Sequence, residues 1–228
     1  MKTVKITDEK KQNFFMKEAY ATLRTNILFS ATGVKVVAFT GCTMGEGKST
    51  VVLALAKSFA ELGKRVLLID ADLRKSTLAT CVQEPIEMGL SAYLSAQADR
   101  ESVIYKTQYP TLDLVFAGRF PPNPIELLNS PKMNELLAFA REAYDVVLID
   151  TPPLGMVVDC IAISPLCDGT VVVLKADETR TRQAQKVVDD LRSKGCAVLG
   201  AILNHATPAK GLCARLKRLF ARRSSGKN

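Results

Sequence analysis

One stretch of the sequence decides the fold: Val36-Val37-Ala38-Phe39-Thr40-Gly41-Cys42-Thr43-Met44-Gly45-Glu46-Gly47-Lys48-Ser49-Thr50. A short β-branched and aromatic run ends at a turn that contains glycines, and an apolar stretch at helical spacing follows the turn. This order predicts a strand, a phosphate-binding loop and a helix. Glycine allows backbone N–H groups to face phosphate oxygens, and the helix N-terminus adds the positive end of its dipole.

The side chains of this loop have specific expected roles. Lys48 would contact the β- and γ-phosphates of a nucleotide, and the Ser49 hydroxyl would bind Mg²⁺. The strict motif has its first glycine at position 42, where this chain has Cys42. The alternative interpretation is an ordinary strand-to-helix turn with an exposed lysine. The predicted nucleotide contacts within the loop are Thr43, Met44, Gly45, Glu46, Gly47, Lys48, Ser49 and Thr50.

Acidic residues follow two further apolar runs. Asp70 and Asp72 come at the end of Leu67-Leu68-Ile69, and Asp150 comes at the end of Val146-Val147-Leu148-Ile149. Ligands of open α/β sheets bind beyond the carboxyl ends of the strands, so these carboxylates are expected near the phosphate loop. An alternative is that the acids only cap the helices that follow them.

These acids complete a predicted catalytic centre. Mg²⁺ bound to phosphate prefers hydroxyl and carboxylate oxygens, and the predicted metal ligands are Ser49, Asp70 and Asp150. Of Asp70 and Asp72, one can bind metal while the other accepts a proton from an incoming hydroxyl. The predicted catalytic residues are therefore Lys48, Asp70, Asp72 and Asp150.

The remaining pattern predicts an α/β protein with a mainly parallel sheet flanked by helices, because strands and helices alternate along the chain. No linker divides the sequence, so residues 1–228 are expected to form a single domain. It would have a loose N-terminus at 1–13, a helix at 14–30 and a basic tail at 209–228. Expected strands lie at 65–70, 112–116, 145–150, 170–175 and 197–203, with helices at 132–143 and 179–193 and short helical pieces at 78–82, 90–96 and 101–105.

Composition excludes several classes of protein. No apolar run approaches the roughly 18 residues that a membrane span requires, and no apolar h-region follows the basic N-terminus. We therefore expect a chain that is not secreted and does not cross a bilayer by itself. The six cysteines include no Cys-x-x-Cys pair and the one histidine is His205, so neither zinc nor a disulfide is expected.

The net charge of +8 is concentrated at one end of the chain. Residues 210–228 carry seven basic side chains and no acid, which leaves +1 for the preceding 209 residues. This distribution favours a local anionic partner, and no nucleic acid is expected. The segment 210–227 has the pattern of a basic amphipathic helix, which binds anionic lipid with about 1 kcal/mol per basic group. The alternative is a terminal helix packed on the sheet.

Four segments together carry a family resemblance: Gly45-Glu46-Gly47-Lys48-Ser49-Thr50, Val66-Leu67-Leu68-Ile69-Asp70-Ala71-Asp72-Leu73-Arg74, Pro121-Pro122-Asn123-Pro124-Ile125-Glu126-Leu127-Leu128 and Asp145-Val146-Val147-Leu148-Ile149-Asp150-Thr151-Pro152-Pro153. The chain resembles the bacterial tyrosine kinases of capsule and exopolysaccharide synthesis, with Walker A, A′ and B elements in order. The resemblance implies a P-loop fold of the MinD/ParA type and ATP- and Mg²⁺-dependent phosphorylation of protein tyrosines, with possible ATPase activity.

The resemblance also implies partners and a location. The activator would be the cytoplasmic segment of a membrane polysaccharide co-polymerase, and the chain would lie in the cytoplasm at the inner face of the plasma membrane. Asp70 is implied as the base and Asp150 as the Walker B acid. Asn204 resembles the asparagine that contacts adenine in the wider ATPase group; its alternative role is that of a turn residue.

Two departures from the family pattern affect assembly. The oligomerisation helix of the family carries Glu-x-x-Arg-x-x-Arg, and here Glu18 and Arg24 are present while Ala21 replaces the middle arginine. A homo-oligomer formed through this helix would be weakened, because a bidentate partner for a carboxylate is lost. The family usually ends in a tyrosine cluster, but no tyrosine follows Tyr144, so we expect no autophosphorylation of such a cluster.

Two other functions fit the same motifs. A MinD/ParA-type ATPase switch would use ATP to control dimerisation and attachment to membrane or cargo. Such switches typically carry a second lysine early in the loop, and Thr43 stands at that place. A regulatory subunit that binds ATP without catalysis is the third possibility, against which the complete set of Lys48, Ser49 and acidic residues argues.

Overall fold

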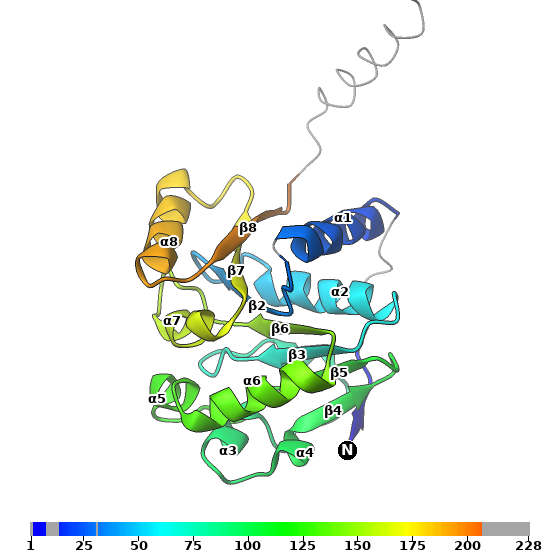
Figure 1. The fold of residues 1–228 in the computed structure, drawn as a ribbon. Coiled ribbons are helices and arrows are strands. Elements are labelled where there is room, and N and C mark those ends of the chain that lie inside the picture. Colours follow the sequence, from blue (N-terminus) through cyan, green and yellow to red (C-terminus); the bar gives the residue numbers. More distant parts are fainter. Residues whose placement is uncertain (1, 8–13, 31, 207–228) are drawn as a thin grey trace, which may run out of the picture.

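The computed structural model describes residues 2–7, 14–30 and 32–206. Within these residues the strands form an eight-stranded sheet in the order β1-β4-β5-β3-β6-β2-β7-β8 (Figure 1). All neighbouring strands are parallel except β4 and β5, which are antiparallel. The predicted fold class is confirmed. The strands are β1 (Thr3–Val4), β2 (Val36–Gly41), β3 (Val66–Asp70), β4 (Ile104–Thr107), β5 (Leu112–Val115), β6 (Val146–Asp150), β7 (Gly169–Lys175) and β8 (Val198–Asn204).

Helices cover both faces of the sheet, which explains why its central strands are apolar throughout. In β3, Leu68 packs towards α1 and α2, whereas Leu67 and Ile69 pack towards α3 and α6 on the opposite face. Figure 1 shows these two layers above and below the strands. The helices are α1 (Phe14–Ser30), α2 (Lys48–Ala60), α3 (Leu90–Leu94), α4 (Arg100–Val103), α5 (Pro124–Leu128), α6 (Pro131–Ala143), α7 (Asp159–Ile163) and α8 (Thr181–Ser193), with 3₁₀ turns at Leu78–Cys81 and Ser164–Leu166.

Two sequence predictions about elements were wrong. Residues 1–13 were expected to be loose, but within the described residues 2–7 Thr3–Val4 pairs with β4, and Val4 and Ile6 are buried; residues 8–13 lie outside the described residues. The helix expected at 101–105 ends at Val103, and the chain continues as strand β4. In both cases pairing with a strand that is distant in sequence overrides the weak local pattern.

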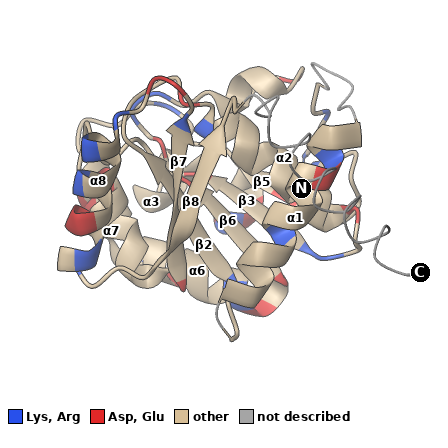
Figure 2. Ribbon diagram, turned by 90° about the horizontal axis from the view of Figure 1, so that it is seen from above, with Lys and Arg blue, Asp and Glu red and all other residues tan. Residues whose placement is uncertain are grey.

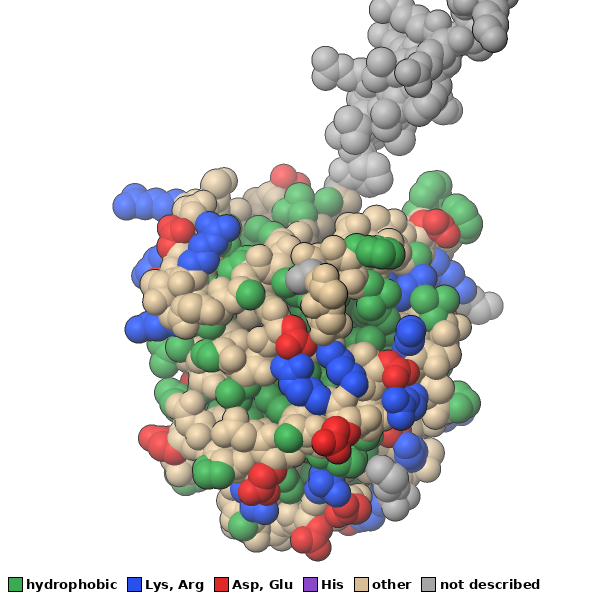
Figure 3. Space-filling model, in the orientation of Figure 1, with side chains coloured by type: hydrophobic (Ala, Val, Ile, Leu, Met, Phe, Trp, Pro, Cys, Tyr) green, Lys and Arg blue, Asp and Glu red, His purple; other side chains and the backbone are tan. Residues whose placement is uncertain are grey.

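Charge on the described surface is mixed. Figure 2 shows α8 beside β7 and β8, carrying bands of both basic and acidic residues. The face in Figure 3 intersperses Lys and Arg with Asp and Glu, as the net charge of +1 outside the tail leads one to expect. The amphipathic helix predicted at 210–227 lies outside the described residues. No helix in the described part of the chain is long and apolar enough to span a membrane.

Helix α1 exposes several aromatic side chains. Phe14, Phe15 and Phe29 are 71%, 81% and 85% exposed, whereas Ile27 is buried against the core. The Arg24 guanidinium donates to the backbone oxygen and hydroxyl of Ser58 at 2.8 Å each. One of the two charged side chains expected to pair between subunits is therefore engaged within the chain.

Candidate active site

The phosphate loop joins β2 to α2 at the carboxyl edge of the sheet, as predicted. Gly45 and Gly47 have φ of 82° and 78°, a conformation that strongly favours glycine. The backbone of Cys42 does not have a positive φ, so a cysteine in place of the glycine of the strict motif causes no backbone strain. The chain has a glycine at position 41, one residue before the first glycine of the strict motif. A Cβ on Gly41 would lie 2.2 Å from the Glu46 carboxylate, so a larger residue there would clash with that carboxylate.

A cavity of about 410 Å³ opens over this loop. All eight residues predicted as nucleotide contacts of the loop line it. Four further residues lie outside the loop and were not predicted as nucleotide contacts: Asp72, Lys75, Thr77 and Pro153. The signal for Lys75 and Thr77 was their position directly after the acidic strand end of β3.

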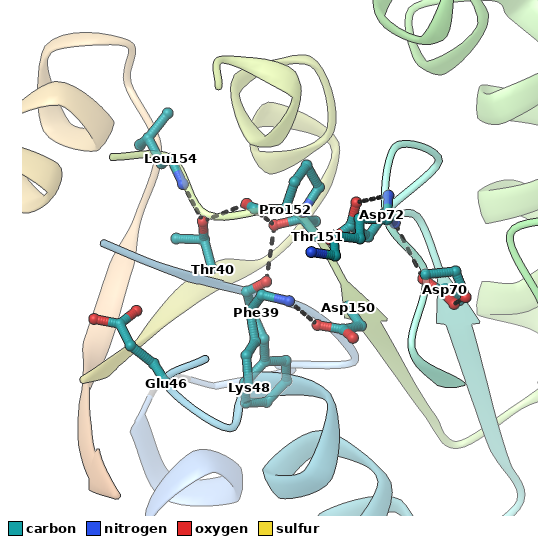
Figure 4. Close-up of polar contacts among 12 residues, drawn as sticks. Phe39, Thr40, Glu46, Lys48, Asp70, Asp72, Asp150, Thr151, Pro152 and Leu154 are labelled. Carbon is teal, nitrogen blue, oxygen red and sulfur yellow. Dashed lines mark hydrogen bonds and ion pairs between the residues drawn. The ribbon is translucent and has the colours of Figure 1, made fainter. Parts of the chain in front are cut away.

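Lys48 and Asp150 form a buried ion pair at the floor of the site (Figure 4). Lys48 Nζ lies 2.8 Å from Asp150 Oδ1, with the two side chains 10% and 1% exposed. The Ser49 hydroxyl also hydrogen-bonds Asp150. Burial raises the pKa of Asp150, and the neighbouring Lys48 ammonium acts in the opposite direction. The lysine and the hydroxyl expected from the sequence thus both contact the expected Walker B acid.

Asp70 lies opposite Asp150 in the sheet, because β3 and β6 are adjacent and these two residues are register partners. Burial, and then the charge of Asp150, raise the pKa of Asp70 to about 8. A carboxyl whose pKa lies near neutrality is suited to general-base catalysis.

Asp70 and Asp72 also organise the turn that follows β3. Asp70 Oδ1 accepts from Asp72 N at 3.1 Å, and the Ser76 hydroxyl donates to Asp70 Oδ2. Asp72 Oδ1 accepts from Lys75 N at 2.9 Å. These bonds shape the turn and cap no helix, because the 3₁₀ turn that follows has Thr77 at its N-cap, without a side-chain hydrogen bond. Asp150 is held instead by side chains of the phosphate loop.

Glu46 lines the cavity, but its carboxylate is buried. The side chain is 2% exposed and points away from Lys48 and Asp150 (Figure 4). Glu46 Oε2 accepts from Cys42 N at 2.8 Å and from Thr43 N at 3.1 Å, and Oε1 accepts from the Thr179 hydroxyl at 2.7 Å. Thr179, which holds this carboxylate from outside the loop, is a residue that the sequence analysis missed.

Asn204 lies at the end of β8, beside the phosphate loop. Its Nδ2 donates to the Glu46 backbone oxygen at 2.9 Å, and its Oδ1 accepts from His205 N at 2.9 Å. A Cβ on Gly47 would meet Asn204 Nδ2 at 2.3 Å, so the two residues are in close contact. The side chain supports the loop, and it does not line the cavity that the other predicted contacts form.

An arginine after the second acid joins two segments of the site. Arg74 Nε and Nη2 donate to Asp159 Oδ2 and Oδ1 at 2.6 and 3.0 Å, and the Asp159 side chain is fully buried. Asp159 begins α7, which follows the Walker B segment. Two hydroxyls hold that segment against β2, because Thr151 Oγ1 donates to Phe39 O and Thr40 Oγ1 donates to Pro152 O, at 2.8 and 2.9 Å.

The donor set fits a magnesium–nucleotide complex. Oxygen ligands from Ser49, Asp70 and Asp150 are what Mg²⁺ prefers, and it usually binds through one or two carboxylates and substrate phosphates. In the described residues, His, Cys, Asp and Glu nowhere form a group of three or more that could hold a metal by themselves. Of the five described cysteines three are buried, and none of the five belongs to such a group.

Comparisons with known proteins agree with this arrangement. Residues 34–191 match the family model described as AAA domain. The chain is 38% identical over 206 residues to the tyrosine-protein kinase CpsD of Streptococcus agalactiae, covering 90% of each chain. It is 40% identical over 203 residues to the tyrosine-protein kinase YwqD of Bacillus subtilis (strain 168), covering 88% of this chain and 84% of that protein.

Solved structures show the same fold. The kinase domain of the Escherichia coli tyrosine kinase ETK is similar with a TM-score of 0.80 at 26% identity, covering 92% of this chain and 93% of that one. The septum site-determining protein MinD of Pyrococcus horikoshii OT3, complexed with Mg-ADP, gives a TM-score of 0.65 at 24% identity over 77% of this chain and 72% of that one. The chain therefore belongs to the bacterial tyrosine kinases, whose P-loop fold is that of the MinD-type ATPases.

Proposed function

We propose that this chain transfers the γ-phosphoryl group of ATP to protein tyrosines and acts in the synthesis of capsular polysaccharide or exopolysaccharide. Its activator would be the cytoplasmic segment of a membrane polysaccharide co-polymerase, at the inner face of the plasma membrane. The observation that carries the proposal is the contact of Lys48 and Ser49 with Asp150, next to Asp70 on the adjacent strand. Relatives named tyrosine-protein kinases at 38% and 40% identity support it.

The proposed roles follow from charge and position. Backbone N–H groups of residues 43–49 and the Lys48 ammonium would bind the phosphates of ATP. Asp70 would accept the proton of the tyrosine hydroxyl while the phenolic oxygen bonds to the γ-phosphorus and ADP leaves. Asp72, at the cavity wall, would orient the acceptor. Mg²⁺, held by Ser49 and Asp150, would neutralise charge on the phosphates.

An ion pair at the centre of the site has a consequence for binding. Because Lys48 is paired with Asp150, phosphate must compete with a carboxylate for the lysine, and metal must compete with an ammonium for Asp150. Simultaneous arrival of nucleotide and metal satisfies both groups. We therefore expect ATP and Mg²⁺ to bind with positive cooperativity.

The decisive experiment uses labelled ATP, Mg²⁺, a Glu-Tyr copolymer as acceptor and the cytoplasmic segment of the co-polymerase. We expect phosphotyrosine on the copolymer, and a loss of more than about 100-fold in Lys48→Ala, as for a preorganised charge contact. Lys64→Ala, an exposed lysine outside the site, serves as the control and should retain full activity. Label released only as free phosphate would instead support the MinD/ParA-type switch, which the loop disfavours because Thr43 replaces its second lysine.

A further inference from the structure

Glu46 is the centre of a hydrogen-bond network that joins the phosphate loop to the ends of β7 and β8. We call the residues Cys42, Thr43, Glu46, Thr179 and Asn204 the Glu46 network. The carboxylate accepts from two backbone N–H groups of its own loop and from the Thr179 hydroxyl. The backbone oxygen of Glu46 accepts from Asn204. A single loop residue is thereby fixed from two neighbouring strand ends.

Thr179 has a fixed orientation, because both hydrogen-bonding functions of its hydroxyl are used. It lies between β7 and α8, outside every motif that identified the site. Its Oγ1 accepts from Lys175 N at 2.9 Å and donates to Glu46 Oε1 at 2.7 Å. Its own N–H donates to Lys175 O at 2.9 Å, which closes the turn. The hydroxyl is therefore held by the end of β7 and aimed at the loop.

The energetic reason for the contact is the burial of a carboxylate. Glu46 is 2% exposed, and a buried carboxylate is stable only when its oxygens accept hydrogen bonds. Oε2 is satisfied within the loop, whereas the bond to Oε1 comes from Thr179. Without that donor, the Glu46 carboxylate would be stabilised by moving to a position where water can hydrogen-bond to it. The backbone N–H groups of Cys42 and Thr43, which donate to the carboxylate, would then move as well.

We infer that Thr179 is a positioning residue that acts through Glu46 to hold the phosphate loop in its nucleotide-binding conformation. The inference rests on the proposed role of this loop in binding ATP. Thr179 does not itself line the cavity, and its contact with the loop is the hydrogen bond to the Glu46 carboxylate. Its effect is expected on nucleotide binding, and equally in the ground state and the transition state.

The test is Thr179→Val, which keeps the shape of the side chain and removes the hydroxyl. A hydrogen bond to a charged group is worth enough that we expect about tenfold weaker binding of methylanthraniloyl-ADP with Mg²⁺. The KM for ATP should rise by a similar factor while kcat changes less than about twofold, the pattern for loss of uniform binding. Amide exchange at Cys42 and Thr43 should become faster. Thr179→Ser, which retains the hydroxyl, should restore both affinity and protection.

Two controls separate positioning from a general loss of stability. Thr111→Val removes a hydroxyl that donates to the Ala60 backbone oxygen at 3.2 Å, remote from the loop, and should leave nucleotide affinity unchanged. In a Glu46→Ala background, Thr179→Val should weaken binding no further, because the two residues act in series. An equal effect of Thr179→Val in both backgrounds, or wild-type affinity and exchange in the single variant, would overturn the inference. If the wild type binds no nucleotide, the proposed function fails, and amide exchange still tests the network.

Discussion

Lys48 and Asp150 illustrate at the scale of single residues how the site balances opposite charges. The two side chains are almost completely buried, and each carries a charge that requires a partner. They satisfy each other through a 2.8 Å contact, with Ser49 as a further hydrogen-bond donor to the carboxylate. The attraction between the two side chains offsets part of the desolvation free energy of burying them in the site.

Removal of the Asp150 charge should separate nucleotide binding from metal dependence. In Asp150→Asn, Lys48 loses its competing carboxylate, so ADP without Mg²⁺ should bind at least as tightly as to wild type. Added Mg²⁺ should then improve ADP affinity far less than in wild type, because a metal ligand is missing. Phosphoryl transfer should fall by about 100-fold or more. Isothermal titration with EDTA or Mg²⁺ measures both effects, and Mg²⁺-dependence equal to wild type would contradict the role of Asp150.

Asp70 should reduce the stability of the nucleotide-free protein as the pH rises. Its pKa is about 8 in the folded chain and near 3.8 in its ordinary state, so between these values the folded state holds more protons than the unfolded state. Stability then falls with rising pH across that window. Asp70→Asn removes this titration, and in metal-free buffer its Tm should exceed that of wild type by more at pH 8 than at pH 5.

The matched control for this pH experiment is Asp99→Asn, at an exposed position that precedes α4. Its Tm difference from wild type should be the same at both pH values, because the side chain is exposed and makes no capping hydrogen bond to α4. A Tm difference for Asp70→Asn that shrinks as the pH rises would show that burial does not keep the Asp70 carboxyl protonated.

At the scale of elements, the site depends on how the turn after β3 is attached to α7. The bidentate pair of Arg74 and Asp159 makes this attachment, and α7 in turn follows the Asp150 segment. Arg74 also lies in the electrostatic field of Asp72 and of Glu126 in α5. Glu126 belongs to the Pro-Pro-Asn-Pro-Ile-Glu segment that supported the family resemblance.

Arg74→Ala should leave the fully buried Asp159 carboxylate without its guanidinium. We expect a loss of roughly 2–3 kcal/mol in the free energy of unfolding, less than the 3–5 kcal/mol of a completely buried pair, because Arg74 is 35% exposed. Arg65→Ala is the matched control, since its pair with Asp145 is 56% and 35% exposed and should contribute little to the free energy of unfolding. Urea denaturation measures both variants. Equal losses would mean that Asp159 finds other donors.

At the scale of the whole molecule, the order of strands brings the site together. Strands β3, β6, β2, β7 and β8 are consecutive in the sheet, and their carboxyl ends present Asp70, Asp150, the phosphate loop, Thr179 and Asn204 along one edge. Residues more than 100 positions apart become neighbours, as the hydrogen bond from Lys48 to Asp150 shows. A ligand that bridges this edge contacts several strand ends at once and should stabilise the whole fold.

Mg·ADP should therefore raise the Tm of the intact protein. At a concentration 100 times the Kd, mass action stabilises the folded state by about 2.7 kcal/mol. For a domain of this size that corresponds to a rise of roughly 5–10 °C. Lys48→Ala should show a much smaller shift at the same concentration, and Lys64→Ala should show the full one. Differential scanning fluorimetry provides the measurement; an equal shift in Lys48→Ala would place the nucleotide elsewhere.

The sequence by itself determined the architecture and the chemical groups of the site. Buried parallel strands have continuous apolar runs, and the phosphate loop has glycines at a fixed spacing. Both can therefore be predicted from short segments of sequence. The carboxylates Asp70 and Asp150 were found because they follow such runs. The family resemblance drawn from the same motifs is confirmed by the comparisons.

Tertiary structure alone decided how these groups are held. The inward orientation of Glu46, the contact from Thr179 and the pairing of Arg74 with Asp159 join residues 85 to 133 positions apart. Strands β1 and β4 likewise exist because their partners supply hydrogen bonds that the local sequence does not specify. The physical reason is the same in each case: a buried polar group must find a partner, and which partner it finds depends on the packed chain.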